Sequence, residues 1–234
     1  MLDKRPDRIA AMFDAVAPRY DLLNHLLSAG LDRRWRARAV RELALRPGAR
    51  LLDLCTGTAD LAIAAARRAG ASVVGVDLAP AMLALGRRKV ARLDLEGRIA
   101  LVRADAMRLP LQDGSVDAAA VGFGIRNVVD PAHAARELRR VLRPGGRLAI
   151  LEFGLPRPPL LRAAYQIYFR RLLPRIGRLV SGHPDAYRYL PDSVLAFPEP
   201  NRFAAMLEGC GFARVRAVPL TFGIVQLFVA ETPA

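Results

Sequence analysis

The sequence predicts a single α/β domain in which a mostly parallel β-sheet carries helices on both faces. Short apolar runs alternate regularly with helical patterns between residues 50 and 153, an order typical of parallel sheets. The last two apolar runs are joined through Pro219 without room for a helix, so they must pair as an antiparallel hairpin. With 234 residues, 53% of them apolar, the chain is long enough to bury one sizeable core.

The apolar runs and the spacing between them place the individual elements. The expected strands lie at residues 50–55, 72–76, 99–103, 116–121, 147–153, 213–218 and 222–231. Helical spacing of apolar residues predicts helices at residues 61–69, 80–93, 132–142 and 201–208. Pro80 suits the first position of a helix, and Pro144-Gly145-Gly146 is a strong stop and turn.

We divide the single domain, residues 1–234, into four segments. Residues 1–46 are expected to form short helices, with Pro18 interrupting the first of them. Residues 47–153 form the ligand-binding core. Residues 154–200 are rich in proline and helical pieces, which indicates an inserted cap rather than a second domain. Residues 201–234 add the last helix and the hairpin.

Cysteine and histidine usage argues against a disulfide framework or a metal site. Cys55 and Cys210 stand far apart, and His25, His133 and His183 are equally scattered, without the paired spacing that either site needs. The apolar runs are too short to span a bilayer, and the first twenty residues lack a signal-peptide pattern. We therefore expect a cytoplasmic protein without a metal.

The formal net charge is +14, and lysine stands only at positions 4 and 89, so nearly all of the positive charge is arginine. A general preference of the chain for arginine explains this positive charge. Attraction to an anionic surface, either nucleic acid or lipid headgroups, explains it equally well. Between residues 157 and 180, arginines are interleaved with leucine, isoleucine, tyrosine and phenylalanine. That mixture suits an interfacial amphipathic helix and, equally, the solvated face of a lid helix.

Residues 51–60 (LLDLCTGTAD) are the most informative stretch of the chain. An apolar run leads into a small-residue turn at Gly57, a helix pattern follows, and the next apolar run ends in Asp77. A strand, a small-residue turn, a helix and a strand ending in a carboxylate form a nucleoside-binding half-site. The turn allows close approach of a ligand, and the carboxylate accepts hydrogen bonds from ribose hydroxyls.

The turn is a poor match to a dinucleotide fingerprint. Gly57, Ala59 and Ala62 occupy its three glycine positions, so only one of them is glycine. Asp53 and Asp60 place carboxylates beside the turn, where they would repel a pyrophosphate and suit an ammonium and a sulfonium. This predicts S-adenosyl-L-methionine as the cofactor, with another nucleotide enzyme and a purely structural turn as the alternatives.

Further residues at the strand ends complete a candidate site. Asp77 is expected to hold the ribose, and Asp105-Ala106 lies where the adenine edge would sit, although Asp105 is also explained as a turn cap. Gly57 and Thr58 should pass under the methionine portion. These placements follow from the rule that ligands of open α/β sheets bind at the carboxyl ends of the strands.

The segment 121–128 (VGFGIRNV) carries the candidate catalytic residues. Glycines on both sides of Phe123 permit close backbone approach, and Arg126 and Asn127 follow the strand end. Methyl transfer to an aromatic carbon needs an ionised ring oxygen, which Arg126 would stabilise while Tyr20 or Asn127 positions it. Pairing of Arg126 with Glu152 or Asp130 is the alternative. The general base remains open.

With these residues assembled, the chain resembles the C-methyltransferases of menaquinone and ubiquinone biosynthesis. The resemblance covers residues 12–231. It rests on the segments FDAVAPRYDLLN at 13–24, LDL at 52–54, GTAD at 57–60, FGIRNV at 123–128, RVLRPGGR at 140–147, LEF at 151–153, LPRIG at 173–177 and YRYL at 187–190.

The resemblance implies the seven-stranded class I methyltransferase sheet, with its last strand antiparallel. It also implies that Thr58 and Asp77 contact the cofactor, as does Asp105, a position that is often asparagine in the family. Gly122 stands where the family frequently has serine. Tyr20, Arg126 and Asn127 match residues that face the quinol ring.

The implied function is S-adenosylmethionine-dependent C-methylation of a polyprenylated quinol. Demethylmenaquinol is the first expectation, with the 2-methoxy-6-polyprenyl-benzoquinol step of ubiquinone synthesis as a second substrate. Such a substrate implies peripheral contact with the inner face of the membrane. No nucleic acid is expected, although an RNA methyltransferase and a non-catalytic scaffold that binds S-adenosylmethionine are the alternative functions. The oligomeric state stays open, a homodimer included.

Overall fold

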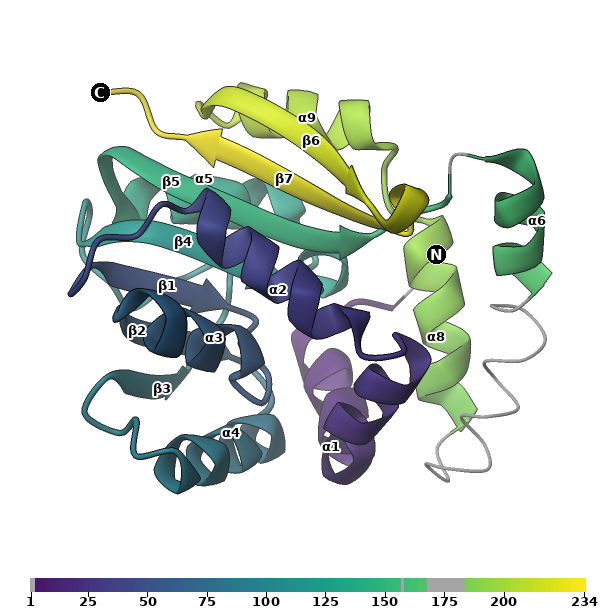
Figure 1. The fold of residues 1–234 in the computed structure, drawn as a ribbon, viewed down its shortest axis with the longest axis horizontal. Coiled ribbons are helices and arrows are strands. Elements are labelled where there is room, and N and C mark those ends of the chain that lie inside the picture. The colour runs from purple at the N-terminus through teal and green to yellow at the C-terminus, as the bar shows by residue number, and fades with distance from the viewer. Residues whose placement is uncertain (1–2, 157, 168–183) are drawn as a thin grey trace.

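The computed structural model describes residues 3–156, 158–167 and 184–234, and its centre is a seven-stranded sheet in the order β3-β2-β1-β4-β5-β7-β6 (Figure 1). The strands are β1 (Arg50–Leu54), β2 (Ser72–Asp77), β3 (Ile99–Arg103), β4 (Val116–Gly122), β5 (Leu142–Phe153), β6 (Ala213–Leu220) and β7 (Val225–Glu231). Strand order reverses between β1 and β4, which is where open α/β sheets bind their ligands.

Strand direction confirms the predicted sheet. The strands from β1 to β5 pair in parallel, and β7 runs antiparallel between β5 and β6. Two strand boundaries differ from expectation by three residues or more, and the others differ by at most two. Strand β7 begins at Val225 rather than at residue 222, because Thr221–Gly223 form a 3-10 turn in which Phe222 has a left-handed φ of 57°. Strand β5 already begins at Leu142, and its pairing with β4 shifts register at the glycine turn.

Helices cover both faces of the sheet. They are α1 (Pro6–Leu27), α2 (Leu31–Glu42), α3 (Asp60–Ala69), α4 (Pro80–Arg92), α5 (Pro131–Val141), α6 (Pro159–Ile167), α8 (Pro184–Leu195) and α9 (Pro200–Gly209), with a 3-10 turn, η1, at Ile125–Asn127. Leu51 faces the core beneath α2 and α3, whereas the next residue, Leu52, faces the core beneath α5 and α9. This alternation gives the sheet an apolar core on each face.

The prediction that Pro18 interrupts the N-terminal helix is wrong, because α1 continues through it from Pro6 to Leu27. Proline disfavours a helix interior, but neighbouring Ala17 is buried against Met82 and Ala79 at the start of α4. Tertiary packing therefore outweighs the local cost of the proline. Asp14 strengthens the same contact, because its Oδ1 accepts a hydrogen bond from the backbone N–H of Ala81, 2.8 Å away.

The cap is described in two parts, α6 and α8, and α8 lies beside α1 (Figure 1). Most of the segment for which membrane contact was predicted, residues 157–180, lies outside the described residues. No helix in the described ranges has both the length and the apolar character needed to cross a bilayer.

Candidate active site

A cavity opens at the carboxyl ends of β1, β2, β3 and β4, and the N-terminal segment up to Tyr20 closes one side of it. Residues from the strand ends and their loops form most of its wall, and residues of α1 and the segment before it form the rest. The lining residues are Lys4, Pro6, Ile9, Phe13, Tyr20, Leu54, Cys55, Gly57, Val76, Asp77, Leu78, Met82, Ala104, Asp105, Ala106, Met107, Gly122, Phe123, Gly124, Asn127, Val128 and Val129.

Asp77 stands at the end of β2 with its carboxylate in the cavity wall. The carboxylate accepts hydrogen bonds from the backbone N–H groups of Gly57, at 2.8 Å, and Ala79, at 2.9 Å. Burial raises the pKa of this carboxyl. An ionised carboxylate offers about four lone-pair sites, so it can still accept a hydrogen bond from a hydroxyl group of a ligand. The position agrees with the ribose-binding role predicted for Asp77.

Asp105 and Ala106 also line the cavity, as the sequence predicts. Asp105 Oδ1 accepts a hydrogen bond from the backbone N–H of Met107 at 2.9 Å, so the residue is a turn cap as well as part of the wall. Ala106 and Met107 add apolar surface beside it. A carboxylate next to an apolar wall suits the amino edge and the face of an adenine ring.

Asp53 does not line the cavity, although it was predicted to face the cofactor. Its buried Oδ2 accepts hydrogen bonds from the Thr56 hydroxyl at 2.6 Å and the Ala62 N–H at 3.0 Å, which ties β1 to the turn and to α3. Burial, opposed by these bonds, raises the pKa of Asp53 to about 7. Its Oδ1 has no hydrogen-bond partner among the described residues. In this arrangement Asp53 shapes the turn.

Thr58 lies behind the cavity wall rather than in it. Its hydroxyl donates to Asp21 of α1 at 2.5 Å and lies 3.1 Å from the ammonium of Lys89. Lys89 also pairs with Asp21, at 2.8 Å, and with Asp60. Asp60, which was predicted to face a positively charged ligand, is therefore occupied by a cation of the protein itself.

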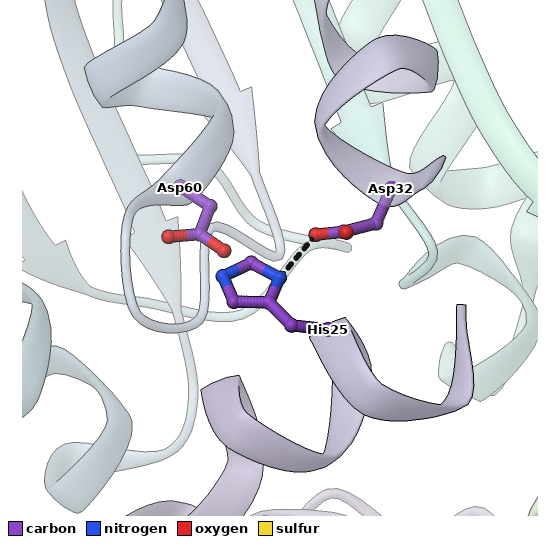
Figure 2. Close-up of side chains that lie close together, drawn as sticks. All are labelled: His25, Asp32 and Asp60. Carbon is purple, nitrogen blue, oxygen red and sulfur yellow. Dashed lines mark hydrogen bonds and ion pairs between the residues drawn. The ribbon is translucent and has the colours of Figure 1, made fainter. Parts of the chain in front are cut away.

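Asp60 belongs to a larger charged cluster with His25 and Asp32 (Figure 2). The three side chains come from α3, α1 and α2, and their potential ligand atoms lie within 4.8 Å of one another. His25 Nδ1 lies 2.8 Å from Asp32 Oδ2. Arg36 pairs with Asp32 and lies 3.3 Å from Asp60. Because Arg36 and Lys89 already balance the two carboxylates, the cluster is an ion-pair network that joins α1 to α2, α3 and α4.

The loop after β4 adopts an unusual backbone. Phe123 itself, and not a flanking glycine, has the left-handed φ of 63°. Gly124 is needed for a close approach, because a Cβ there would lie 2.2 Å from the Cβ of Cys55. At Gly122, a Cβ would come within 3.3 Å of Leu61 Cδ1, so a serine at this position would press on α3.

The two polar residues of this loop have different surroundings. Arg126 is buried and does not line the cavity. Its guanidinium pairs with Glu152 at 2.7 Å and donates to Ser193 of α8 at 3.2 Å, which is the pairing that the sequence left open as an alternative. Asn127 does line the cavity, and its buried Oδ1 has no partner among the described residues.

Tyr20 enters the same cavity from α1. Burial raises the pKa of its phenol, so its hydroxyl remains protonated near neutral pH and can donate a hydrogen bond. Tyr20 and Asn127 therefore supply polar groups on the side of the cavity that Phe13 and Phe123 make aromatic. Both residues therefore line the cavity, and their contacts with a quinol ring stay a prediction.

The lining fits an adenosylated sulfonium better than a phosphate-bearing coenzyme. Asp77 and Asp105 are the acidic groups of the wall, whereas Lys4 is the one lysine or arginine among the described lining residues. A Cβ built on Gly57 would meet only Met82 Cε, at 3.7 Å, so the turn leaves room beside its backbone. S-adenosylmethionine carries no phosphate and has a positively charged sulfur, which these carboxylates attract.

Sequence reasoning missed several residues of the site. Lys4 and Met82 line the cavity, and Asp21 and Lys89 fix α1 beside it. The rarity of lysine at positions 4 and 89 is the one signal that could have drawn attention to Lys4 and Lys89. Met82 has no such signal, because an apolar helical residue is most often a core residue.

Known proteins with similar sequences carry names from quinone methylation. The demethylmenaquinone methyltransferase of Thermus thermophilus is 52% identical over 224 residues, which cover 95% of this chain and 100% of that protein. The ubiquinone/menaquinone biosynthesis C-methyltransferase of Syntrophotalea carbinolica is 53% identical over 227 residues, covering 97% and 92%.

Solved structures support the fold. A SAM-dependent methyltransferase from Aquifex aeolicus superposes with a TM-score of 0.64 at 20% identity, covering 97% of this chain and 98% of that chain. Phosphoethanolamine N-methyltransferase 2 of Haemonchus contortus gives 0.66 at 17% identity, covering 86% and 53%. At these identities the likeness establishes the class I methyltransferase fold. The profile of the ubiE/COQ5 methyltransferase family matches residues 1–231, and this chain therefore belongs to that family.

Proposed function

We propose that this protein methylates a ring carbon of a polyprenylated quinol, with demethylmenaquinol as the substrate to test first. The observation that carries the proposal is the match of the family profile over residues 1–231. The cavity supports it, because residues suited to bind S-adenosylmethionine and aromatic side chains line the same space. The relatives named above are described as acting in menaquinone or ubiquinone biosynthesis. The 2-methoxy-6-polyprenyl-benzoquinol is the second substrate to test.

S-adenosylmethionine supplies, when bound, an electrophilic methyl group on a sulfonium. Asp77 binds the ribose hydroxyls, and Asp105 with Ala106 accommodates the adenine. Gly57 leaves space for the rest of the cofactor. Because the surrounding wall is mostly apolar, it strengthens the electrostatic contacts inside.

The acceptor ring would occupy the compartment formed by Phe13, Tyr20, Phe123 and Asn127. Tyr20 donates a hydrogen bond to one ring oxygen, and the unpartnered Asn127 Oδ1 accepts one from a ring hydroxyl. These contacts hold the reacting carbon in line with the methyl group, which is the main contribution an enzyme makes to such a displacement. Arg126 does not contact the ring but pairs with Glu152 and so holds the loop that carries Phe123 and Asn127 in place.

Contact with a membrane surface is part of the proposal, because a polyprenyl tail is insoluble in water. Leu22 and Leu26, one helical turn apart on α1, are 63% and 61% exposed, and Leu160 of α6 is 89% exposed. Exposed leucines on helices suit shallow insertion between headgroups. Flotation with anionic vesicles at low salt should recover the protein at the lipid layer, and Leu22→Ser/Leu26→Ser should reduce that fraction. No flotation of the wild type would contradict membrane contact.

The test of the activity uses the purified protein, S-adenosylmethionine and chemically reduced demethylmenaquinol, with the product measured by mass spectrometry. We expect a product heavier by one methyl group that requires reduction of the quinone. Asp77→Ala should abolish binding of S-adenosylhomocysteine in calorimetry, whereas Glu96→Gln, at an exposed acid outside the cavity, should not. Methylation of bulk RNA but of neither quinol would overturn the proposal.

A further inference from the structure

Lys4 lies in the wall of the cavity although it precedes the first helix. It lines the same cavity as Phe13, Tyr20, Phe123 and Asn127, which are the residues placed around the acceptor ring. The cavity wall has carboxylates on the cofactor side, at Asp77 and Asp105. Lys4 is the one cation of the described wall, and its charge interacts with Arg126 and Glu152, which lie behind the loop that carries Phe123 and Asn127.

The Lys4 ammonium has no hydrogen-bond or ion-pair partner within the part of the chain that the structure describes. Among the described residues, none of the hydrogen bonds and ion pairs involves Lys4 Nζ, in contrast to Lys89, which pairs with Asp21 and Asp60. The Lys4 side chain is partly buried. Arg126 and Glu152, the two charged groups that influence the pKa of Lys4, are paired with each other. Burial, and then the positive charge of Arg126, lowers the pKa of Lys4, as expected for a cation that lacks a counter-ion.

We propose that Lys4 is the residue that binds the ionised oxygen of the acceptor ring. The inference rests on the proposed function, because it takes the acceptor to be a quinol. Arg126 was the first candidate for this role, but its guanidinium is committed to Glu152 and lies outside the cavity wall. Lys4 is the remaining cation of the described wall, and a lysine ammonium is a compact point charge that suits a single oxygen.

The role follows from the chemistry of carbon methylation. A quinol O–H loses its proton to water, and the resulting oxygen anion faces the Lys4 ammonium. The adjacent ring carbon then forms the new C–C bond, while the C–S bond breaks and its electron pair stays on sulfur. The same carbon loses its proton to water, and the ring oxygen regains one, so that the aromatic ring is restored. The reaction passes through this oxygen anion, and Lys4 lowers its free energy.

The test measures binding of 4-nitro-1-naphthol, whose ionised and neutral forms differ in colour. The probe is titrated with protein in the presence of S-adenosylhomocysteine, below and above the pH at which the probe ionises. We expect Lys4→Met to weaken binding of the ionised form about tenfold or more, as for loss of a hydrogen bond to a charged group, and to leave binding of the neutral form unchanged. Lys4→Arg keeps the charge and should retain most of the affinity.

Arg8→Met is the matched control. It removes the same charge from the same segment, but Arg8 is largely exposed, pairs with Asp3 and lies outside the cavity wall. This variant should bind both forms of the probe as the wild type does. A Lys4→Met protein that binds the ionised probe as tightly as the wild type would overturn the inference.

The inference and the proposed function fail in different ways. If the wild type methylates the quinol and Lys4→Met does so with unchanged kcat and KM, Lys4 does not bind the ring oxygen and the function stands. If the wild type methylates no quinol but its binding of the ionised probe still depends on Lys4, the anion site stands and the proposed substrate is wrong.

Discussion

Arg126 and Glu152 form a buried ion pair directly behind the cavity wall, with Arg126 Nη1 2.7 Å from Glu152 Oε1 and side-chain exposures of 6% and 0%. Glu152 also accepts hydrogen bonds from the backbone N–H groups of Phe153, at 2.9 Å, and of Arg126 itself, at 3.2 Å. The pair therefore joins the end of β5 to the loop that carries Asn127. Its geometry assigns Arg126 to positioning that loop.

The first prediction concerns this pair. Arg126→Met should lower the free energy of unfolding by about 3–5 kcal/mol, because it leaves a buried carboxylate without a counter-ion. Arg126→Met/Glu152→Gln should recover much of that loss, and urea unfolding measures both. If turnover recovers with stability in the double variant, Arg126 only positions the loop. Restored stability without turnover would instead place Arg126 in the chemistry.

The second prediction concerns the pH dependence of stability at Asp53, whose pKa burial raises to about 7 from about 3.9 in an unfolded chain. At a pH between these two pKa values, Asp53 binds more protons in the folded state than in the unfolded state. The contribution of Asp53 to stability is therefore greatest at low pH and is lost as the pH rises towards 7. Asp53→Asn should gain stability relative to the wild type between pH 5 and pH 8, as measured by urea unfolding. The same difference at both pH values would contradict the raised pKa.

The third prediction concerns the approach of Gly124 to Cys55. Gly124→Ala should cost about 1–3 kcal/mol of stability or more, because its Cβ would lie 2.2 Å from the Cβ of Cys55. Cys55 has a left-handed φ of 56°, so Cys55→Gly suits the backbone and removes the clash. In the Cys55→Gly background, the cost of Gly124→Ala should shrink, and a double-mutant cycle measures the coupling. Simple additivity would show that the two residues do not compete for the same space.

The fourth prediction concerns the attachment of α1 through Lys89. Lys89→Met should leave Asp21 without its cation and weaken the contact between α1 and α4. Because these side chains are partly exposed, we expect a loss of about 1 kcal/mol. Hydrogen exchange of the backbone amides of α1 should become faster, whereas Arg88→Met, at an exposed neighbour on α4, should not change it. Unchanged exchange in Lys89→Met would show that the other contacts of α1 with α4 hold the helix without Lys89.

Much of the fold could be predicted because its signals are local. Apolar runs and turn residues located every strand, and the shortness of the last connection required the antiparallel pair that β6 and β7 form. Pro219, which was expected to make that connection, lies within β6 opposite Gln226, and the turn follows at Thr221–Gly223. The error at Pro18 has a physical cause. Local preference breaks the helix there, but burial of Ala17 against α4 is a contact between distant parts of the chain that a local pattern does not contain.

The candidate site was predicted in part for the same reason. Positions that follow a strand end, such as Asp77 and Asp105, could be placed from the sequence because parallel strands bring their carboxyl ends to one edge. Whether a side chain then faces the cavity or the interior depends on rotation and packing. Asp53 and Thr58 turned inward to partners on other elements, and sequence spacing does not reveal those partners.

By itself, the sequence determined the order of the strands along the chain, the turn at Gly57 and the supply of carboxylates at the sheet edge, because each depends on neighbours within a few residues. The tertiary structure alone decided which charges remain available to a ligand. Arg126 and Asp60 are committed to partners within the protein, while Lys4 reaches the cavity. A charge is balanced by whatever lies within a few ångströms in space, and folding sets that distance between residues far apart in the chain.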